Sequence, residues 1–135
     1  MKSKNLIFTK KDFELMQMVL INWNRDSELT LANYQTLSKE LEQATVLDES
    51  EIPNTIVRFG SIIDIETPIG LLNGYQIVTP VNRNPKQKKL SVLSAVGSAV
   101  IGYSQGDKVK WSFPMGQKTI KIINVNNECL SSITK

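Results

Sequence analysis

The spacing of apolar residues changes near residue 50, and this change constrains the fold more than any other feature of the sequence. Residues 9–44 carry apolar side chains three and four positions apart, which is the spacing of amphipathic helices. Residues 56–125 instead carry short runs rich in β-branched and aromatic residues, several of which alternate with polar ones, as in strands. The sequence therefore predicts an α+β protein, with helices first and a mostly antiparallel sheet after them.

Two short helices are expected in the first part. Thr9 is a candidate N-cap of the first helix, with Asp12 in the position of a capping-box acid, and Ser27 or Thr30 could cap the second. Each helix has one apolar stripe with 3-4-3 spacing: Phe13, Met16, Leu20 and Trp23, then Tyr34, Leu37, Leu41 and Ala44. The matching stripes and the short polar link predict an antiparallel hairpin. Because such short helices are marginally stable alone, they must pack on each other or on the second part.

The second part is expected to form a sheet with one helix. Strands are predicted at residues 56–59, 61–67, 75–79, 90–93, 107–113 and 118–125. Turn chemistry is present at residues 68–70 and at Asn73–Gly74, and residues 82–89 form a charged loop. A short buried helix is predicted at residues 96–103, which Gly102 helps to end.

The acidic, proline-containing segment between the two patterns is expected to be a linker. The predicted organisation is a helical hairpin in residues 1–47, a linker in residues 48–55 and a sheet domain in residues 56–135. The charge also divides here. Residues 1–52 carry six basic and nine acidic side chains, whereas residues 53–135 carry ten basic and four acidic ones. The basic second part favours an acidic partner, although its charge is too small to predict nucleic-acid binding by itself.

The composition excludes several classes of protein. The chain has no histidine and a single cysteine, Cys129, so histidine-based catalytic triads and most zinc sites are excluded. We expect no enzyme activity, no cofactor and no metal site. No apolar run approaches the roughly 20 residues of a membrane span, and the basic N-terminus is not followed by a signal-peptide core. We therefore expect a cytoplasmic protein that does not bind membranes.

Two charged segments each leave two interpretations open. Asp26 and Glu28 lie between the predicted helices, where they could hold a divalent cation or form a solvated turn. The basic loop is a solvated hairpin tip or a nucleic-acid site, and the first is favoured because no aromatic residues interrupt its cluster of Arg83, Lys86, Lys88 and Lys89.

Residues 91–116, SVLSAVGSAVIGYSQGDKVKWSFPMG, resemble the signature of the C-terminal domain of the Gre-factor family. The matching positions are Ser91, Ser94, Gly97, Ala99, Gly102, Gly106, Asp107, Pro114 and Gly116. Ala95 stands where the family usually has proline, and Met115 where a small residue is usual. The short first part resembles the short-hairpin branch of the family, which includes Rnk, the regulator of nucleoside diphosphate kinase.

The resemblance implies an FKBP-like domain that docks on RNA polymerase near the rim of its secondary channel. Longer relatives insert a coiled coil whose acidic tip positions a metal ion and triggers transcript cleavage. The hairpin expected here reaches only about 21 Å, so we expect docking without stimulation of cleavage. The expected docking residues are Ser94, Ala95, Val96, Gly97, Asp107, Pro114, Met115 and Gly116. Val96 and Met115 are either exposed contacts or part of the core.

Two further functions stay open at this point. A monomeric adapter that binds a protein other than polymerase would carry the same domain, and a pull-down separates the two. An FKBP-like fold also invites a prolyl isomerase interpretation, which requires a pocket lined by aromatic residues such as Phe59, Tyr75, Trp111 and Phe113. The alternation of the strands instead places most of these rings in the core. Direct sequence-specific binding of nucleic acid is not expected.

Overall fold

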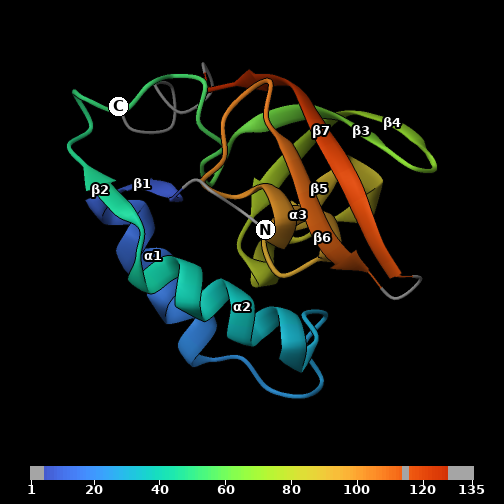
Figure 1. The fold of residues 1–135 in the computed structure, drawn as a ribbon, viewed down its shortest axis with the longest axis horizontal. Helices are drawn as coiled ribbons and strands as arrows, with labels where there is room; N and C mark the ends of the chain where they lie inside the picture. The colour runs from blue at the N-terminus through green and yellow to red at the C-terminus, as the bar shows by residue number, and fades with distance from the viewer. Residues whose placement is uncertain (1–4, 114–115, 128–135) are drawn as a thin grey trace.

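The computed structural model describes residues 5–113 and 116–127 (Figure 1). In chain order the elements are β1 (Ile7–Thr9), α1 (Lys10–Ile21), α2 (Leu31–Glu42), β2 (Thr45–Leu47), β3 (Ile62–Thr67), β4 (Gly70–Val78), η1 (Pro80–Asn82), η2 (Pro85–Gln87), β5 (Lys89–Ser91), α3 (Ala95–Val100), β6 (Lys108–Phe113) and β7 (Gly116–Asn126). The predicted α+β class is confirmed. None of the helices in the described ranges is long and apolar enough to cross a membrane.

A curled five-stranded sheet forms the larger part of the molecule, with strand order β5-β4-β3-β7-β6. Neighbouring strands are antiparallel except for β4 and β5, which are parallel. The expected mostly antiparallel sheet is therefore confirmed, with one parallel pair at this edge. Residues 79–88, which contain the short 3-10 helices η1 and η2, carry the chain back so that β5 enters in the same direction as β4. The FKBP-like description stays a prediction.

Two β-bulges lie at the same level of the sheet, on either side of β3. The register of β4 against β3 shifts between Ile63 and Ile65 of β3. Asn73–Gly74 of β4 lies at this shift, inside the strand. The turn predicted at Asn73–Gly74 is therefore wrong: the Gly74 N–H donates to Asp64 Oδ1 at 2.8 Å, and the strand continues. On β7 the register shifts opposite Asp64 and Ile65. Bulges increase local twist, which accounts for the curl of the sheet.

Residues 56–59 do not form the predicted strand. Ile56 makes only an isolated bridge to Ser104, and the Val57 N–H donates to the Tyr103 carbonyl at 2.8 Å. The side chains of Ile56 and Val57 are buried, as the apolar pattern requires. The segment is thus a core-lining loop whose backbone pairs with the loop after α3 rather than with a strand.

Both helices of the first part occur at the predicted stripes. Thr9 caps α1 and Thr30 caps α2. Each threonine hydroxyl accepts the backbone N–H of the residue three positions later, at 3.2 Å. Trp23 and Tyr34 stack with ring centroids 4.3 Å apart, which ties the end of α1 to the start of α2. The Trp23 indole N–H donates to the Leu29 carbonyl at 2.8 Å.

The first part also contains two strands that the apolar pattern did not predict. β1 and β2 pair in parallel at the base of the two helices, with Ile7 opposite Thr45. The Ile7 N–H donates to the Gly102 carbonyl at 3.1 Å, which joins this small sheet to the segment after α3. A strand of three residues is too short to show alternation, so only the tertiary contact reveals it.

Apolar side chains from both parts of the chain form one hydrophobic cluster. The helices contribute Met16 and Leu37, and the sheet contributes Ile63, Trp111 and Ile122 among others. The alternation predicted for Ile120 and Ile122 is confirmed, since both are fully buried. The division into a hairpin, a linker and a sheet domain stays a prediction.

Gly102 offers a test of the contact between β1 and the sheet domain. Its φ of +83° is left-handed, and a Cβ there would lie 2.9 Å from the Leu6 Cβ. Gly106, with φ of +91°, has no atom within 4 Å of the same position. Alanine should cost about 1 to 2 kcal/mol of unfolding free energy at either position because of the backbone. Gly102→Ala should cost about 1 to 3 kcal/mol more because of overpacking.

Urea unfolding of the two variants measures this difference, with Gly106→Ala as the matched control. Equal losses in the two variants would show that β1 yields to the added methyl group and that its packing on Gly102 is loose.

Candidate functional site

The turn before α3 holds four of the predicted docking residues. Ser94 is the N-cap of the helix: its hydroxyl donates to the Ser91 carbonyl at 2.7 Å and accepts the Gly97 N–H at 3.1 Å. The Ser91 hydroxyl accepts the Leu93 N–H at 3.0 Å, which tightens the same turn. These bonds fix the backbone over which the helix begins.

Gly97 is required by close packing of this turn. A Cβ at this position would lie 2.3 Å from the Ser91 carbonyl oxygen and 3.0 Å from the Ser94 hydroxyl. No side chain fits there without moving the backbone. Ser94 and Gly97 therefore shape the turn, and the side chains between them are left to form its surface.

Ala95 and Val96 are those side chains. Both are half-buried, and Val96 packs in part against the hydrophobic cluster. Val96 is thus neither a fully exposed contact nor a fully buried core residue. The turn presents a small, partly apolar surface with no charged group between Ser94 and Gly97.

Asp107 has a structural contact at the start of β6. Its Oδ2 accepts the Ser104 N–H at 2.9 Å, and its own N–H donates to the Ser104 carbonyl at 3.0 Å. Its carbonyl accepts the Ile122 N–H at 2.9 Å. The carboxylate therefore closes the turn that leads into the strand.

The predicted docking residues do not form one cluster. Gly116 is exposed at the start of β7, where it pairs with Phe113 at the far end of β6 from Asp107. Phe113 lies six positions after Asp107 in extended chain, a distance of about 20 Å. Pro114 and Met115 lie outside the described residues. The signature is thus spread along the β6–β7 hairpin and the α3 turn.

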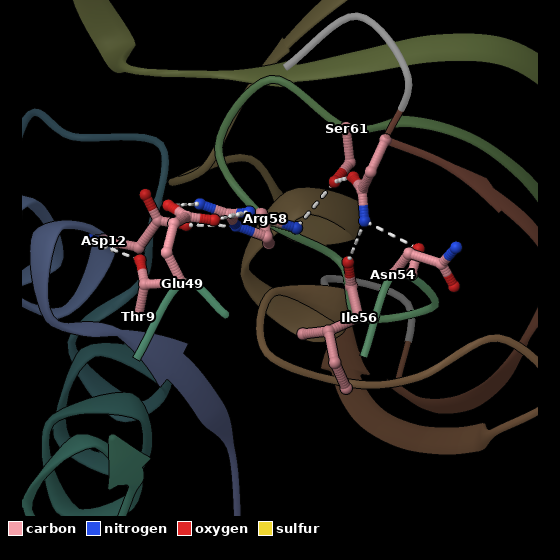
Figure 2. A network of polar contacts seen from close by, with 8 residues as sticks. Thr9, Asp12, Glu49, Asn54, Ile56, Arg58 and Ser61 are labelled. Atoms are coloured by element: carbon pink, nitrogen blue, oxygen red, sulfur yellow. Dashed lines mark hydrogen bonds and ion pairs between the residues drawn. The ribbon is translucent and has the colours of Figure 1, made fainter. Parts of the chain in front are cut away.

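A polar network that the sequence did not reveal joins the first part of the chain to the sheet (Figure 2). The Arg58 guanidinium contacts two carboxylates: Nε lies 3.1 Å from Asp12 Oδ2, and both Nη atoms lie 2.8 Å from the oxygens of Glu49. Asp12 comes from the first turn of α1 and Glu49 from the predicted linker. Asp12 therefore pairs with Arg58, which the expected capping role does not account for.

The network continues from Arg58 to the end of β7. The Arg58 N–H donates to the Ser61 hydroxyl at 2.7 Å, and that hydroxyl donates to Asn127 Oδ1. The Asn127 amide donates to the carbonyls of Asn54 at 2.9 Å and Ile56 at 2.8 Å. One chain of bonds thus connects α1, the linker, the core-lining loop and the last strand (Figure 2).

Burial and charge act in opposite directions on this pair. Burial raises the pKa of Asp12, and the hydrogen bond and charge of Arg58 offset part of that rise. Burial lowers the pKa of Arg58, but its contacts with Glu49 and Asp12 outweigh this, so the guanidinium stays charged. The pair is held in a partly desolvated place where loss of either partner is costly.

A second contact holds the helices along the sheet. The side-chain amide of Asn33, in the first turn of α2, donates to the Ser112 carbonyl of β6 at 2.7 Å. Asn33 is buried, whereas Asp26 and Glu28 are exposed in the connection between the helices. The two helices lie beside the sheet rather than extending away from it (Figure 1).

The structure offers little for the isomerase interpretation. Trp111 is buried in the core, and Tyr75 is half-buried with the Lys88 ammonium 5.6 Å from its ring centroid. One surface cavity of about 460 Å³ is lined mainly by carboxamide side chains, among them Asn54, Gln105 and Asn124. Neither this cavity nor the smaller one beside Gly102 is lined by Phe59, Tyr75 or Trp111.

Comparison with known proteins settles the family. Residues 52–127, more than half of the chain, match the family described as "Transcription elongation factor, GreA/GreB, C-term". The protein belongs to the GreA/GreB family. The resemblance of residues 91–116 to the Gre-factor signature is confirmed, while the Rnk-like branch stays a prediction.

Relatives in this family are bacterial transcription elongation factors. The chain is 33% identical over 92 residues to the GreA of Syntrophus aciditrophicus, which covers 67% of this chain and 57% of that protein. It is 32% identical over 102 residues to the GreA of Clostridium beijerinckii, covering 75% of this chain and 64% of the relative. The chain thus spans only about three fifths of these relatives.

A solved structure matches over nearly its whole length. It is titled a prokaryotic transcription elongation factor GreA/GreB from Nitrosomonas europaea, and it superposes with a TM-score of 0.71 at 26% identity. The match covers 92% of this chain and 99% of that one. The arrangement of helices and sheet described here therefore has a counterpart in a family member.

Removal of the Arg58–Asp12 contact should lower the stability of the fold in a pH-dependent way. Arg58→Met leaves Asp12 buried without its cation, so the unfolding free energy at neutral pH should fall by about 3 to 5 kcal/mol. Without Arg58 the pKa of Asp12 rises further above 3.8, and the native state then holds a proton that the unfolded chain has released. The loss should therefore shrink at acid pH and grow as the pH rises.

Urea unfolding at a series of pH values from acid to neutral checks both the loss of stability and its dependence on pH. Asp12→Asn/Arg58→Met is the control, because it has no carboxylate to titrate at residue 12 and should regain part of the lost stability. A loss in Arg58→Met that does not vary with pH would show that Asp12 is solvated.

Proposed function

We propose that this protein docks on RNA polymerase at the rim of the secondary channel and regulates transcription there without stimulating transcript cleavage. Membership of the GreA/GreB family and relatives named as transcription elongation factors support polymerase as the partner. The protein acts in the cytoplasm as a monomer, with no cofactor and no enzyme activity of its own.

The position of the two helices carries the second half of this proposal. α1 and α2 have 12 residues each, a length of about 18 Å at 1.5 Å per residue. They are held against the sheet by the Arg58–Asp12 pair at one end and the Asn33–Ser112 bond at the other. A short element fixed in this way does not carry Asp26 and Glu28 deep into a channel.

The docking surface that we propose centres on the α3 turn. Ser94 and Gly97 set its backbone, and Ala95 and Val96 are half-exposed on it. The second part of the proposed surface is the exposed Gly116 at the start of β7, and we assign Pro114 and Met115 to it from the signature alone. Asp107 acts through the backbone by closing the turn into β6.

The α3 turn is tested by a charge placed at its rim. An acid is favourable in the first turn of a helix, so Ala95→Glu should leave the fold intact. It places a charge in a small apolar contact, so the affinity for core RNA polymerase should fall at least about tenfold, or 1.4 kcal/mol. Fluorescence anisotropy with polymerase from the same bacterium measures this, with a full-length Gre factor as competitor.

Met18→Glu is the matched control for that experiment. Met18 lies on α1, outside the signature segment, and is 62% exposed, so the same acid there should change affinity little. Equal effects of the two substitutions would move the docking surface elsewhere. Failure of the unmodified chain to bind polymerase would favour the adapter function.

Transcript cleavage tests the remaining part of the proposal. In backtracked elongation complexes, saturating amounts of this protein should leave the cleavage rate at its intrinsic value, because the acidic turn does not reach the active site. Added together with a full-length Gre factor, it should slow cleavage by competing for the same rim. Stimulation comparable to that of the full-length factor would contradict the proposal.

A further inference from the structure

The outer face of β6 and β7 carries three exposed lysines. We call Lys108, Lys110 and Lys121 the lysine face. The residues between them on the same strands, among them Val109 and Ile120, are fully or almost fully buried in the core. The lysines therefore stand at fixed positions on a rigid part of the sheet.

The three lysines are close together. Lys108 lies directly opposite Lys121 across the β6–β7 pair, where Cβ atoms are about 4.5 to 5.5 Å apart. Lys110 lies two residues along the same strand, about 7 Å from Lys108 on the same face. Like charges directly opposite each other destabilise a sheet, so the arrangement works against folding.

Within residues 5–113 and 116–127, none of the three ammonium groups forms a hydrogen bond or an ion pair. Glu66 lies opposite Lys121 on β3 and is exposed, but the two side chains do not pair. The repulsion on this face is therefore not neutralised from inside the described part of the protein.

Protection of a sheet edge accounts for only part of the lysine face. Lysines on an edge strand prevent unwanted strand pairing, and β6 is an edge strand. That reason covers Lys108 and Lys110. It does not cover Lys121, because the backbone of this residue is paired on both sides, with Lys108 on β6 and with Glu66 on β3.

From this geometry we infer that the lysine face is a second docking surface, which binds an acidic protein surface of the polymerase and adds to the contact at the α3 turn. The inference rests on the proposed function. Ile123 lies two positions after Lys121 on β7 and is 43% exposed. It adds an apolar contact of the kind that protein partners use.

The surroundings of the lysine face favour a protein over a nucleic acid. A phosphate backbone that continued across the sheet would meet Asp64 and Glu66 on β3, whereas a compact group of carboxylates on a protein can contact the three lysines alone. The three residues are lysines, with no arginine and no exposed aromatic ring among them, whereas single-stranded nucleic acids are bound by stacking on aromatic side chains. Long-range attraction to carboxylates requires only point charges in a compact group.

Neutral substitutions test the inference without reversing charge in a strand. Lys108→Gln/Lys110→Gln/Lys121→Gln should weaken binding to core RNA polymerase at least about tenfold at low salt, mainly through a slower association rate. It should also flatten the dependence of affinity on salt concentration. Its Tm at low salt should equal or exceed that of the unmodified protein, because the Lys108–Lys121 repulsion is gone.

Arg83→Gln/Lys86→Gln/Lys89→Gln is the matched control. It removes the same charge from the segment around η1, η2 and β5, and its affinity should change less than about twofold if only the lysine face contacts an acidic surface. Stopped-flow association at several salt concentrations, with thermal unfolding of each variant, gives all the required values.

The outcomes separate this inference from the proposed function. If the unmodified chain does not bind polymerase, the proposed function fails and the inference fails with it. If the chain binds and the two triple variants lose affinity equally, or not at all, only the inference is overturned. Loss of affinity for single-stranded RNA with unchanged polymerase binding would also overturn it, in favour of a nucleic-acid surface.

Discussion

The arrangement of the two parts of this molecule depends on the Arg58 guanidinium. It pairs with Asp12 at the start of α1 and with Glu49 in the predicted linker, and its backbone N–H begins the bonds that reach Asn127. Only 12% of the Arg58 side chain and 7% of the Asp12 side chain are exposed, so salt screens this pair weakly. Because desolvation offsets much of the attraction, the pair contributes more to a fixed orientation than to net stability.

A fixed orientation of the helices determines what the protein can do. With α1 held at Asp12 and α2 held at Asn33, the helices pack along the sheet and share its hydrophobic cluster. An element in this position cannot serve as a long probe. What stays available for recognition is the surface of the sheet domain, in particular the α3 turn and the outer face of β6 and β7. The same packing that stabilises the short helices is thus the structural basis for the proposed docking without stimulation of cleavage.

The sequence predicted those elements whose stability is local and missed those that depend on distant partners. The stripes through Met16 and Leu37 and the alternation through Ile120 and Ile122 are set by burial of one face, so periodicity finds them. β1 and β2 exist because two segments 38 residues apart meet at Ile7 and Thr45. Asn73–Gly74 has turn chemistry, but the same left-handed backbone serves a bulge, and only the register distinguishes the two. Asp12 has the spacing of a capping-box acid, and nothing near it in sequence indicates its pairing with Arg58.

The predicted docking residues show what a family signature records. Ser94, Gly97 and Asp107 match the signature, and each is explained by a backbone bond or a close contact. The side chains free to meet a partner, Ala95 and Val96, lie where this chain departs from the signature or where the signature allows variation. Lys108 and Lys110 lie within residues 91–116 but are not among the matching positions of the signature, and Lys121 lies outside that segment. The signature therefore identifies the scaffold, and the proposed docking would take its specificity from the positions that the scaffold leaves free.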